Sequence, residues 1–330
     1  MVDNFILPLY NAVMTTVDEI LKILIRKKDY VSGEEIAEAL NITRAAVSKS
    51  VGILKKRGCN IAAKTNGGYK YEGGGGISAG AISARLDDCP RGEIIVLDEV
   101  KSTNDYLKDL AERGENVCAV IAKKQSGGRG RFSRPFYSPE NVGVYMSVLL
   151  KAPLDIRLGV KITSYAATMT ARAIESFTGG GVGVKWVNDL FMNGKKICGI
   201  LTEAVVDFET QKLKYAIVGI GINVLNGKFP EELKNVASNI ESESGVKINL
   251  NDLIAEIIKN SENFESEILS GKFFEEYKKR SILTGKTVRV VSGTEEFTAA
   301  VMGISDSGAL IVERGGELIA VNAGDVSIRF

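Results

Sequence analysis

A run of four glycines, Gly73 to Gly76, divides the 330-residue chain into two unequal parts. Consecutive glycines carry a high backbone entropy and offer no side chain to pack, so they are poorly suited to the interior of a helix or strand. The run and the small residues that follow it, 73–80, therefore predict a flexible linker between domains at 14–72 and from 81 onward. Residues 1–13 fit no element and are treated as an extension of unknown role, with Met14 as an alternative start.

The amino-acid composition excludes several kinds of catalytic and metal-binding site. The chain contains no histidine, which excludes Ser-His-Asp triads, histidine-ligated metals and imidazole acid–base catalysis. No apolar run reaches the roughly 18 residues needed to cross a bilayer, so a cytoplasmic location without membrane association is expected. The cysteines form no CxxC pair, which argues against a disulfide framework or a zinc site, and they are expected to be reduced and mostly buried: Cys59, Cys89, Cys118 and Cys198.

The N-terminal region combines a helix-turn-helix pattern with strong positive charge. A short acidic helix is followed by a turn at Asn41, and a second helix is predicted from the N-cap Thr43 to the stop signal Gly58. The interval 39–71 contains seven Lys or Arg and no Asp or Glu, although the net charge of the whole chain is only +1. Such a cluster favours nucleic acid as a partner, the alternative being a solvated charged face on a small helical domain.

The faces of the second helix can be assigned from its periodicity. Val47, Val51 and Leu54 follow the spacing i, i+4, i+7 and are expected to face the core. The following segment IAAKTNGGYKY alternates around Asn66-Gly67, which predicts a basic β-hairpin with a two-residue turn. The residues left outside by this arrangement include Arg44, Ser48, Lys49, Lys55 and, on the hairpin, Lys64.

The remainder of the chain predicts a mixed, mostly antiparallel sheet covered by helices, and hence an α+β class. A long helix is expected over 156–177 and a helical stretch over 251–280. The tail from 281 to 330 has short strands separated by close turns, which indicates a small β-barrel. The predicted strands are EIIVLDEV, VCAVIAKK, VGVYMSVLL, VGVKWVNDLFM, KKICGILTEAVVD and LKYAIVGIGINV, with a helix opened by Ser102 or Thr103 after the first.

The stretch QSGGRGRFSRPFYSP, 125–139, places glycines and arginines in one loop between two of these strands. Its glycines let backbone amides approach an anion, while Arg129 and Arg131 supply paired donors for phosphate or carboxylate. The loop lacks the Lys-Ser/Thr of a Walker motif, and its position between strands argues against a disordered RNA-binding tract. An anion-binding loop is predicted.

A second polar cluster is KWVND, 185–189, followed by NGKKICGIL. A hairpin around Asn193-Gly194 would bring Lys185, Asn188 and Asp189 close to Lys196 on the next strand. For Lys185 alone, an ordinary solvent-facing position is the competing interpretation, because a strand that alternates always puts some charge outside. Trp186 is expected to belong to the core.

Taken in order, STNDYL, QSGGRGRFSRPFYSP, KWVND, KKICGILTE and VGIGINV resemble the biotin protein ligases, and the N-terminal helix-turn-helix resembles their bifunctional subclass, which also represses biotin synthesis genes. The resemblance implies a winged helix-turn-helix at 14–72, a class II synthetase-like catalytic domain at 81–280 and an SH3-like barrel at 281–330. It also implies an enzyme that makes biotinyl-5′-AMP from biotin and ATP with Mg²⁺, and then transfers biotin to a lysine of a carboxyl carrier protein.

The resemblance assigns residues to these steps. Lys196, Arg131 and Asp189 would be catalytic, with Lys196 bridging the biotin carboxylate and the α-phosphate, and Asp189 accepting a proton or holding Mg²⁺. The positions implied to bind biotin are Ser102, Thr103, Asn104, Gln125, Gly128, Arg129, Gly130, Arg131 and Lys196. Those implied to bind ATP or the adenylate are Arg129, Arg131, Phe136, Asn188, Asp189, Lys196 and Asn223.

The same resemblance implies a homodimer when the adenylate is bound, and binding to operator DNA. Arg44, Ser48 and Lys49 would reach bases or phosphates, and the residues implied to contact mainly the DNA backbone are Lys55, Lys56 and Lys64. Three positions depart from the family pattern: Ser133 replaces a usual Gly, Phe136 a usual Trp, and Val187 the Pro of KWPND. These departures bear on loop closure and nucleotide affinity.

Two rival interpretations are compatible with parts of the sequence. A lipoate-type protein ligase also makes an acyl-adenylate, but the GRGR loop with KWVND and the attached helix-turn-helix disfavours it. A DNA-binding biotin sensor without ligase turnover would be expected to have lost catalytic residues. The presence of Arg129, Arg131, Lys196 and Asp189 argues against such decay.

Overall fold

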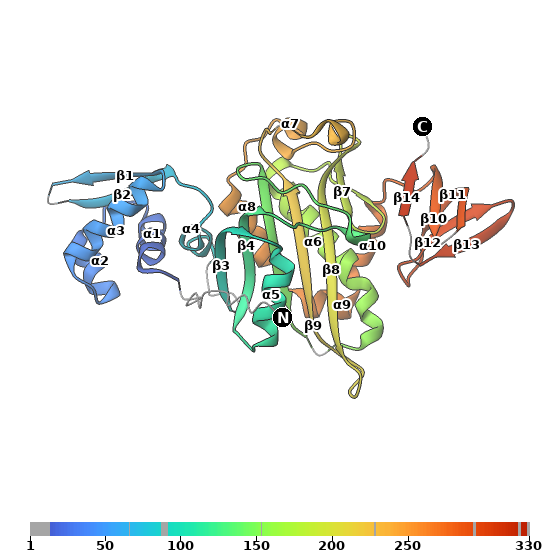
Figure 1. Cartoon of the computed structure of the whole chain (residues 1–330), viewed down its shortest axis with the longest axis horizontal. Coiled ribbons are helices and arrows are strands. Elements are labelled where there is room, and N and C mark those ends of the chain that lie inside the picture. The colour runs from blue at the N-terminus through green and yellow to red at the C-terminus, as the bar shows by residue number, and fades with distance from the viewer. Residues whose placement is uncertain are drawn as a thin grey trace, which may run out of the picture. The chain divides into compact units, whose positions relative to one another are not determined.

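A computed structural model describes residues 14–65, 67–86, 92–152, 154–227, 229–292, 295–322 and 325–328 (Figure 1). The chain divides into two compact units, Met1–Ile95 and Val96–Phe330. The extension 1–13 and Cys89 lie outside the described residues, and Cys59, Cys118 and Cys198 are buried free thiols. No helix in the described part of the chain is long and apolar enough to span a bilayer.

The first unit contains the predicted helix-turn-helix, preceded by a helix that the sequence analysis did not assign. The side chain of Thr43 accepts a hydrogen bond from the Ala46 amide at 3.2 Å and so begins the basic helix, while Gly58 ends it with φ +86°. Val47, Val51 and Leu54 are at most 3% exposed, as their spacing predicts. The elements are α1 (Thr16–Lys27), α2 (Gly33–Leu40), α3 (Arg44–Lys56), β1 (Cys59–Lys64), β2 (Gly68–Gly74) and α4 (Ala79–Ser83).

The predicted basic hairpin is present, but its connection differs from the expected two-residue turn. Lys64 pairs with Gly68, so three residues, 65–67, join β1 to β2. The central one, Asn66, lies outside the described residues. The Asn-Gly signal identified the hairpin but not its register, because Gly68 with φ +89° begins the second strand.

The segment predicted as a flexible linker, 73–80, does not form one over its first residues. Gly73 and Gly74 pair with Asn60 and Cys59 at the end of the hairpin. The chain then enters α4, which contributes Ala81 to the core that contains α1. Arg26 of α1 donates hydrogen bonds to three carbonyls around the end of α4, those of Ser83, Ala84 and Leu86. The apolar residues after the glycines explain this, because α4 buries them against α1 instead of exposing them.

The second unit is built on a seven-stranded sheet in the order β3-β4-β5-β9-β8-β7-β6 (Figure 1). The strands from β4 to β6 in this order pair antiparallel with their neighbours. Every residue of β5 is buried, which fits its continuous apolar sequence and its central place. The strands are β3 (Glu93–Val100), β4 (Val117–Gln125), β5 (Gly143–Leu150), β6 (Gly183–Lys185), β7 (Asp189–Met192), β8 (Lys195–Asp207) and β9 (Lys212–Asn223).

Of the two helical segments predicted in this unit, the first is α-helical over only part of its length, and the second is helical as expected. The helix expected over 156–177 begins as a 3-10 helix and becomes α-helical only at Ile162. The stretch 251–280 forms three helices, because Glu262 and Asn263 close the first and Gly271, with φ +67°, separates the other two. The elements are α5 (Thr103–Glu112), α6 (Ile162–Thr178), α7 (Ile240–Ser244), α8 (Leu250–Ser261), α9 (Phe264–Ser270) and α10 (Lys272–Lys279), with 3-10 helices at Arg131–Ser133, Ile156–Lys161 and Glu231–Leu233.

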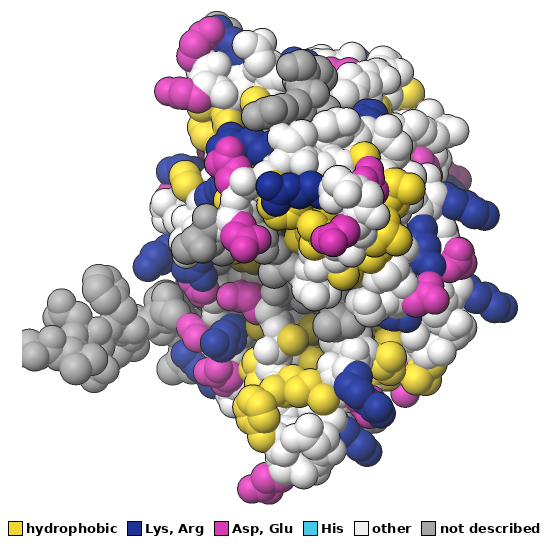
Figure 2. All heavy atoms as spheres, turned by 90° about the vertical axis from the view of Figure 1, so that its right-hand side faces the viewer, with side chains coloured by type: hydrophobic (Ala, Val, Ile, Leu, Met, Phe, Trp, Pro, Cys, Tyr) yellow, Lys and Arg dark blue, Asp and Glu magenta, His cyan; other side chains and the backbone are white. Residues whose placement is uncertain are grey.

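The tail forms the predicted β-structure, a five-stranded antiparallel sheet in the order β13-β12-β11-β10-β14. Trp186 is 4% exposed and packs into the apolar core of these strands, which confirms its assignment to the core. Figure 2 shows that basic and acidic side chains are interspersed on the face seen there, around a group of hydrophobic ones. The strands are β10 (Thr287–Ser292), β11 (Glu295–Ile304), β12 (Leu310–Arg314), β13 (Glu317–Val321) and β14 (Asp325–Ile328).

Candidate active site

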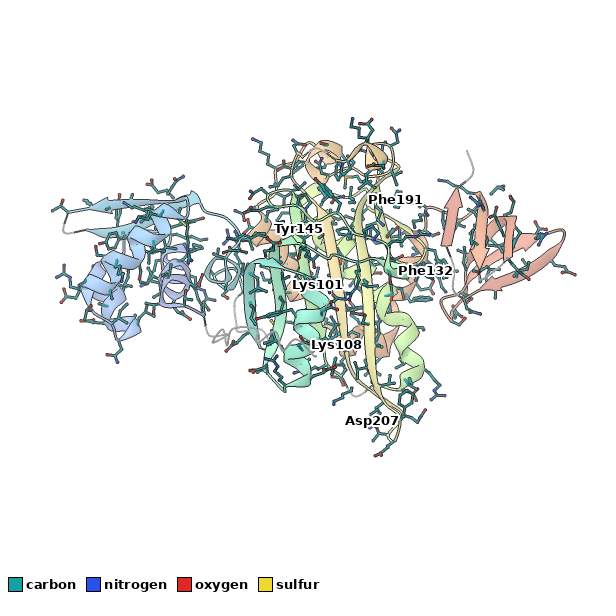
Figure 3. The ribbon with its side chains drawn as sticks, viewed as in Figure 1. Lys101, Lys108, Phe132, Tyr145, Phe191 and Asp207 are labelled. Atoms are coloured by element: carbon teal, nitrogen blue, oxygen red, sulfur yellow. The ribbon has the colours of Figure 1, made fainter. Side chains whose placement is uncertain are left out.

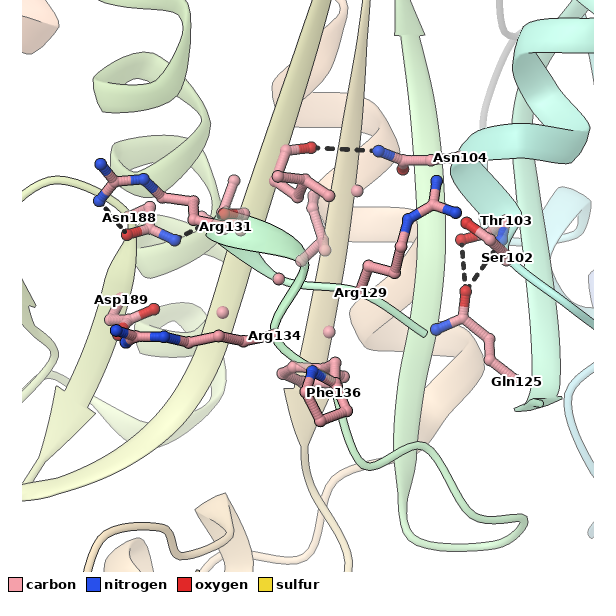
Figure 4. Close-up of a pocket in the computed structure, with 18 of the residues that line it drawn as sticks. Ser102, Thr103, Asn104, Gln125, Arg129, Arg131, Arg134, Phe136, Asn188 and Asp189 are labelled. Carbon is pink, nitrogen blue, oxygen red and sulfur yellow. Dashed lines mark hydrogen bonds between the residues drawn. The ribbon is translucent and has the colours of Figure 1, made fainter. Parts of the chain in front are cut away.

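A cavity of about 210 Å³ lies over β8 and β9 and beneath the glycine-arginine loop (Figure 4). It collects segments that are far apart in the chain: the start of α5, the end of β4, the loop itself and the β7–β8 hairpin. Eleven of the residues predicted for ligand binding or catalysis line it: Ser102, Thr103, Asn104, Gln125, Arg129, Gly130, Arg131, Phe136, Asn188, Asp189 and Lys196.

The end of the cavity beside α5 carries neutral hydrogen-bonding side chains next to the ion pair of Arg129 and Asp105. Ser102 caps α5 by accepting a hydrogen bond from the Asp105 amide, which fixes the first turn of the helix at the cavity wall. The Gln125 side-chain oxygen accepts hydrogen bonds from the Thr103 amide at 2.9 Å and from its hydroxyl at 3.1 Å. Thr103 and Asn104 are almost fully buried, so their polar groups are held in fixed directions.

The end of the cavity at the β7–β8 hairpin is lined by charged side chains. The β7–β8 hairpin turns at Asn193-Gly194, as predicted, and places Lys196 Nζ 2.7 Å from Asp189 Oδ1. Arg131 donates to the Asn188 side-chain oxygen at 3.4 Å (Figure 4). Burial, followed by the charge of Asp189, raises the pKa of the adjacent Cys198 thiol, which indicates a poorly solvated wall behind this pair.

Arg129 is not placed as a partner of Arg131. Its guanidinium makes two hydrogen bonds to the Asp105 carboxylate, at 3.0 and 2.5 Å, on the α5 side of the cavity. These hydrogen bonds and the charge of Asp105 raise the pKa of Arg129. Arg131 instead lies beside Asn188 across the cavity, so the two guanidinium groups lie on different sides of it.

Phe136 forms part of the floor. Gly199 and Gly221 face each other on β8 and β9, and a Cβ atom on Gly221 would lie 2.3 Å from the Phe136 ring. The ring also packs edge-on against Tyr145, with centroids 6.5 Å apart. The ring therefore requires glycine at 221, and at 199 a Cβ atom would make a tight contact of 3.2 Å with it.

The turn of the loop contains two residues in the left-handed region. Phe132 and Ser133 both have φ +56°, a conformation that costs a residue other than glycine about 1–2 kcal/mol. Ser133 is the position where the family pattern has glycine, so the departure noted in the sequence falls on a strained residue. Phe132 is 64% exposed, and the guanidinium of Arg131 lies 5.0 Å from the centre of its ring.

The KWVND segment is held from two sides. The Trp186 indole donates to the Gly308 carbonyl at 2.9 Å, and the Tyr277 hydroxyl donates to the Val187 carbonyl at 3.0 Å. Tyr277 is fully buried and burial raises its pKa, so it remains a neutral donor. Both contacts fix the backbone immediately before Asn188 and Asp189.

Three residues singled out in the sequence are not part of the cavity lining. Gly128 faces Ser138 and the Phe136 carbonyl, Asn223 pairs with Gly143 at the end of β9, and Lys185 stacks over Phe191 with Nζ 6.0 Å from the ring centre. Lining residues that the sequence analysis missed are Phe132, Arg134, Pro135, Met146, Gly199, Ile200, Leu201, Gly219, Ile220 and Gly221. The alternating glycines of VGIGINV could have indicated the bare strand face.

The residues predicted to bind DNA form a second candidate site, which is an exposed surface and not a cavity. The six predicted residues, Arg44, Ser48, Lys49, Lys55, Lys56 and Lys64, are all exposed on α3 and β1. Within the described part of the chain, the cations among them form no ion pair with an acidic side chain. Their charge is therefore available to solvent and to an anionic partner.

Sequence models of known families match three segments of the chain. The biotin/lipoate A/B protein ligase family matches residues 96–223, an HTH domain matches 16–70, and the biotin protein ligase C terminal domain matches 283–329. The biotin protein ligase of Aquifex aeolicus, solved in complex with biotin and ATP, is 26% identical with a TM-score of 0.59, and covers 72% of this chain and 98% of its own. The fold and the site thus define a protein ligase of the biotin and lipoate class.

Relatives that span nearly the whole chain narrow this class. The bifunctional ligase/repressor BirA of Bacillus spizizenii is 32% identical over 91% of this chain and 94% of its own length. The Escherichia coli protein of the same name is 28% identical over 93% and 95%. This chain belongs to the bifunctional ligase/repressor family.

Proposed function

We propose that this protein activates biotin with ATP and transfers it to a lysine of a biotin carboxyl carrier protein. One observation carries the proposal: a single cavity joins a group of neutral hydrogen-bonding side chains, Thr103, Asn104 and Gln125, to a group of charged ones, Arg131, Asp189 and Lys196. The first group suits an uncharged ring and the second suits a carboxylate that meets a phosphate.

In the first step, the biotin carboxylate attacks the α-phosphate of ATP and pyrophosphate leaves. Negative charge accumulates on the phosphoryl oxygens, so a fixed cation at that point stabilises the transition state. Lys196 is suited to this because the Asp189 carboxylate holds its ammonium group 2.7 Å away. Arg131, oriented by Asn188, contributes a second cation from the loop.

In the second step, a lysine amine of the carrier protein attacks the carbonyl of biotinyl-5′-AMP and AMP leaves. The amine must lose a proton, and Asp189 is the carboxylate in the cavity lining that can accept it. The loop, which roofs the cavity with Gly130, Phe132 and Arg134, limits the access of water to the mixed anhydride.

Mg²⁺ is proposed to enter with ATP. The described residues contain no group of three or more Cys, Asp or Glu side chains that could hold a metal ion without the nucleotide. Asp189 alone, with the Asn188 amide oxygen nearby, fits an ion that takes most of its ligands from phosphates and water. The ion would supply neutralisation of phosphate charge.

The N-terminal unit is proposed to bind operator DNA of biotin genes as part of an adenylate-dependent homodimer. An HTH match at 16–70, six exposed polar or basic residues on α3 and β1, and full-length relatives named as repressors support this. In a two-fold dimer, two such helices would meet a palindromic operator. DNA, ATP and the carrier protein would all be met in the cytoplasm.

Labelled biotin or labelled lipoate, supplied with ATP and either carrier domain, tests the enzymatic part. Biotin should be incorporated into the biotin carrier and lipoate into neither. Incorporation of lipoate alone would contradict the proposal, and binding of biotin without any transfer would favour a DNA-binding sensor.

A mobility-shift assay tests the regulatory part. Biotin with ATP should strengthen binding to a palindromic operator and yield a complex of two chains per operator. Equal binding with and without the two ligands would contradict ligand-dependent repression and leave the ligase proposal intact.

A further inference from the structure

Glu203 ends the KKICGILTE motif and has no role in the chemistry above. It lies on β8 and is partly buried. Its Oε2 atom accepts a hydrogen bond from the Asn104 side-chain amide at 2.9 Å. The same amide nitrogen also lies 3.4 Å from the Leu201 carbonyl, the interaction drawn beside Asn104 in Figure 4.

These two acceptors determine which way the Asn104 carboxamide faces. The side chain is 4% exposed, so its nitrogen and oxygen must both find partners within the protein or the ligand. If the group were rotated by half a turn, its oxygen would face the Glu203 carboxylate and the Leu201 carbonyl, and three acceptors would meet without a proton. The carboxylate of Glu203 therefore keeps the nitrogen on the β8 side.

The oxygen of Asn104 is consequently turned away from Glu203, within a side chain that lines the cavity. It lies 2.6 Å from the Ser147 hydroxyl, which is fully buried and also lies 2.8 Å from the Thr103 hydroxyl. It rests on Gly219, where a Cβ atom would come within 2.3 Å of it. A carbonyl oxygen has two lone pairs, so one remains for a ligand after Ser147 has donated.

We propose that Glu203 is a positioning residue for substrate specificity: it fixes Asn104 as a hydrogen-bond acceptor for a ring N–H, and so selects carboxylic acids that carry a cyclic urea. The inference rests on the proposed function. A dithiolane ring, as in lipoate, has no N–H to offer, and an acceptor left buried without a donor is costly. Glu203 does not touch the substrate and acts through Asn104.

The test is steady-state ATP–pyrophosphate exchange by the full chain, with KM measured separately for biotin and for ATP. Glu203→Gln keeps the size of the side chain but lets it present an amide, so Asn104 can rotate. We expect KM for biotin to rise about tenfold, the equivalent of one lost hydrogen bond, with KM for ATP unchanged. Asn104→Asp, which sets two carboxylates against each other, should raise it about a hundredfold.

A double variant that exchanges the amide and the carboxylate between residues 104 and 203 makes the test more specific. In Asn104→Asp with Glu203→Gln, the amide donor sits on residue 203 and the acceptor oxygen remains at residue 104. This double variant should return KM for biotin to within about threefold of the native value, a coupling that a purely structural role for either residue does not produce.

Asp207→Asn provides the matched control. Asp207 is an acid of the same strand at the tip of the β8–β9 hairpin, remote from Phe132 and Tyr145 in Figure 3. It should leave both KM values unchanged, and thermal unfolding of every variant checks folding.

An unchanged KM for biotin in Glu203→Gln, or a double variant no better than Asn104→Asp, overturns the inference while the proposed function stands. Absence of biotin-dependent exchange in the native chain overturns both.

Discussion

The cations of this protein are arranged in two contrasting ways. On α3, Arg44, Lys49, Lys55 and Lys56 project into solvent. In the cavity, Lys196 and Arg129 are each held by a carboxylate, at 2.7 Å and 2.5–3.0 Å. Exposed charges suit attraction to a long polyanion, where approximate placement is enough. Fixed charges suit a transition state, which is stabilised only by a cation that is already in position.

The largest expected effect is on the fixed cation of the cavity. Lys196→Ala should lower adenylate formation by about 100- to 1,000-fold, the loss found when one preorganised charge donor is removed. Single-turnover formation of biotinyl-AMP measures this directly. Ligand-free, nonspecific DNA binding should not change, and turnover near the native rate would show that Lys196 has no such role.

An effect of similar free energy, but on the stability of the fold, is expected when a partly buried group of ion pairs is broken. Arg280 bridges Glu175 of α6 and Glu276 of α10, and its side chain is only 14% exposed. Arg280→Ala leaves the partly buried Glu175 carboxylate without its cation, whereas Glu276 keeps its ion pair with Arg172, and the free energy of unfolding should fall by about 3 kcal/mol. Denaturant unfolding followed by fluorescence measures it, and a loss below about 1 kcal/mol, as for a surface pair, would contradict this arrangement.

The ion pair of Arg280 and Glu175 also predicts how the stability of the fold depends on pH. Burial alone raises the pKa of Glu175, but the hydrogen bonds from Arg280 and from the Val182 amide outweigh it, so the pKa lies below the usual 4.5. A depressed carboxylate pKa stabilises the fold above that value and loses its contribution as the pH falls through the folded pKa. Acidification below pH 4.5 should therefore destabilise the native chain more steeply than Arg280→Ala.

A moderate effect on KM for ATP is expected when Gly221, which contacts the Phe136 ring, is replaced. Gly221→Ala places a methyl group against the Phe136 ring, at a glycine whose φ is not in the left-handed region. Displacement of the ring should raise KM for ATP by about tenfold, the scale of about 1–3 kcal/mol for overpacking. Gly159→Ala, where a Cβ meets open space and φ is not in the left-handed region, is the comparison variant. Unchanged ATP affinity in Gly221→Ala would remove Phe136 from the nucleotide site.

The smallest expected effect is on the exposed cations. Lys55→Gln with Lys56→Gln should weaken operator binding only several-fold at moderate salt, and should reduce the slope of log K against log salt by about 1 for each phosphate that is no longer neutralised. Filter binding over a range of salt concentrations gives the slope. Ligase turnover should stay native. An unchanged slope would place DNA on another surface.

The comparison also explains what the sequence could predict. Local signals located α3, the basic hairpin, the β7–β8 turn and the glycine-arginine loop, because caps, Asn-Gly turns and periodicity act over a few residues. The family motifs then indicated eleven of the residues that line the cavity. Contacts between distant segments could not be predicted in this way.

Three contacts show what could not be predicted from local sequence. Arg129 turns to Asp105 because α5 happens to bring a carboxylate within reach, which its loop sequence does not encode. Glu203 meets Asn104 across 99 residues. The glycine run was interpreted from its entropy alone, although pairing with β1 and the packing of Ala81 offset that cost.

In the proposed mechanism, one cavity activates the carboxylate of biotin between Arg131 and Lys196. The most direct measurement is ATP–pyrophosphate exchange by the native chain with biotin, with lipoate and with neither. Exchange should require biotin and should fall by at least about a hundredfold in Lys196→Ala. Exchange that lipoate supports and biotin does not, or that persists undiminished in Lys196→Ala, would contradict this mechanism.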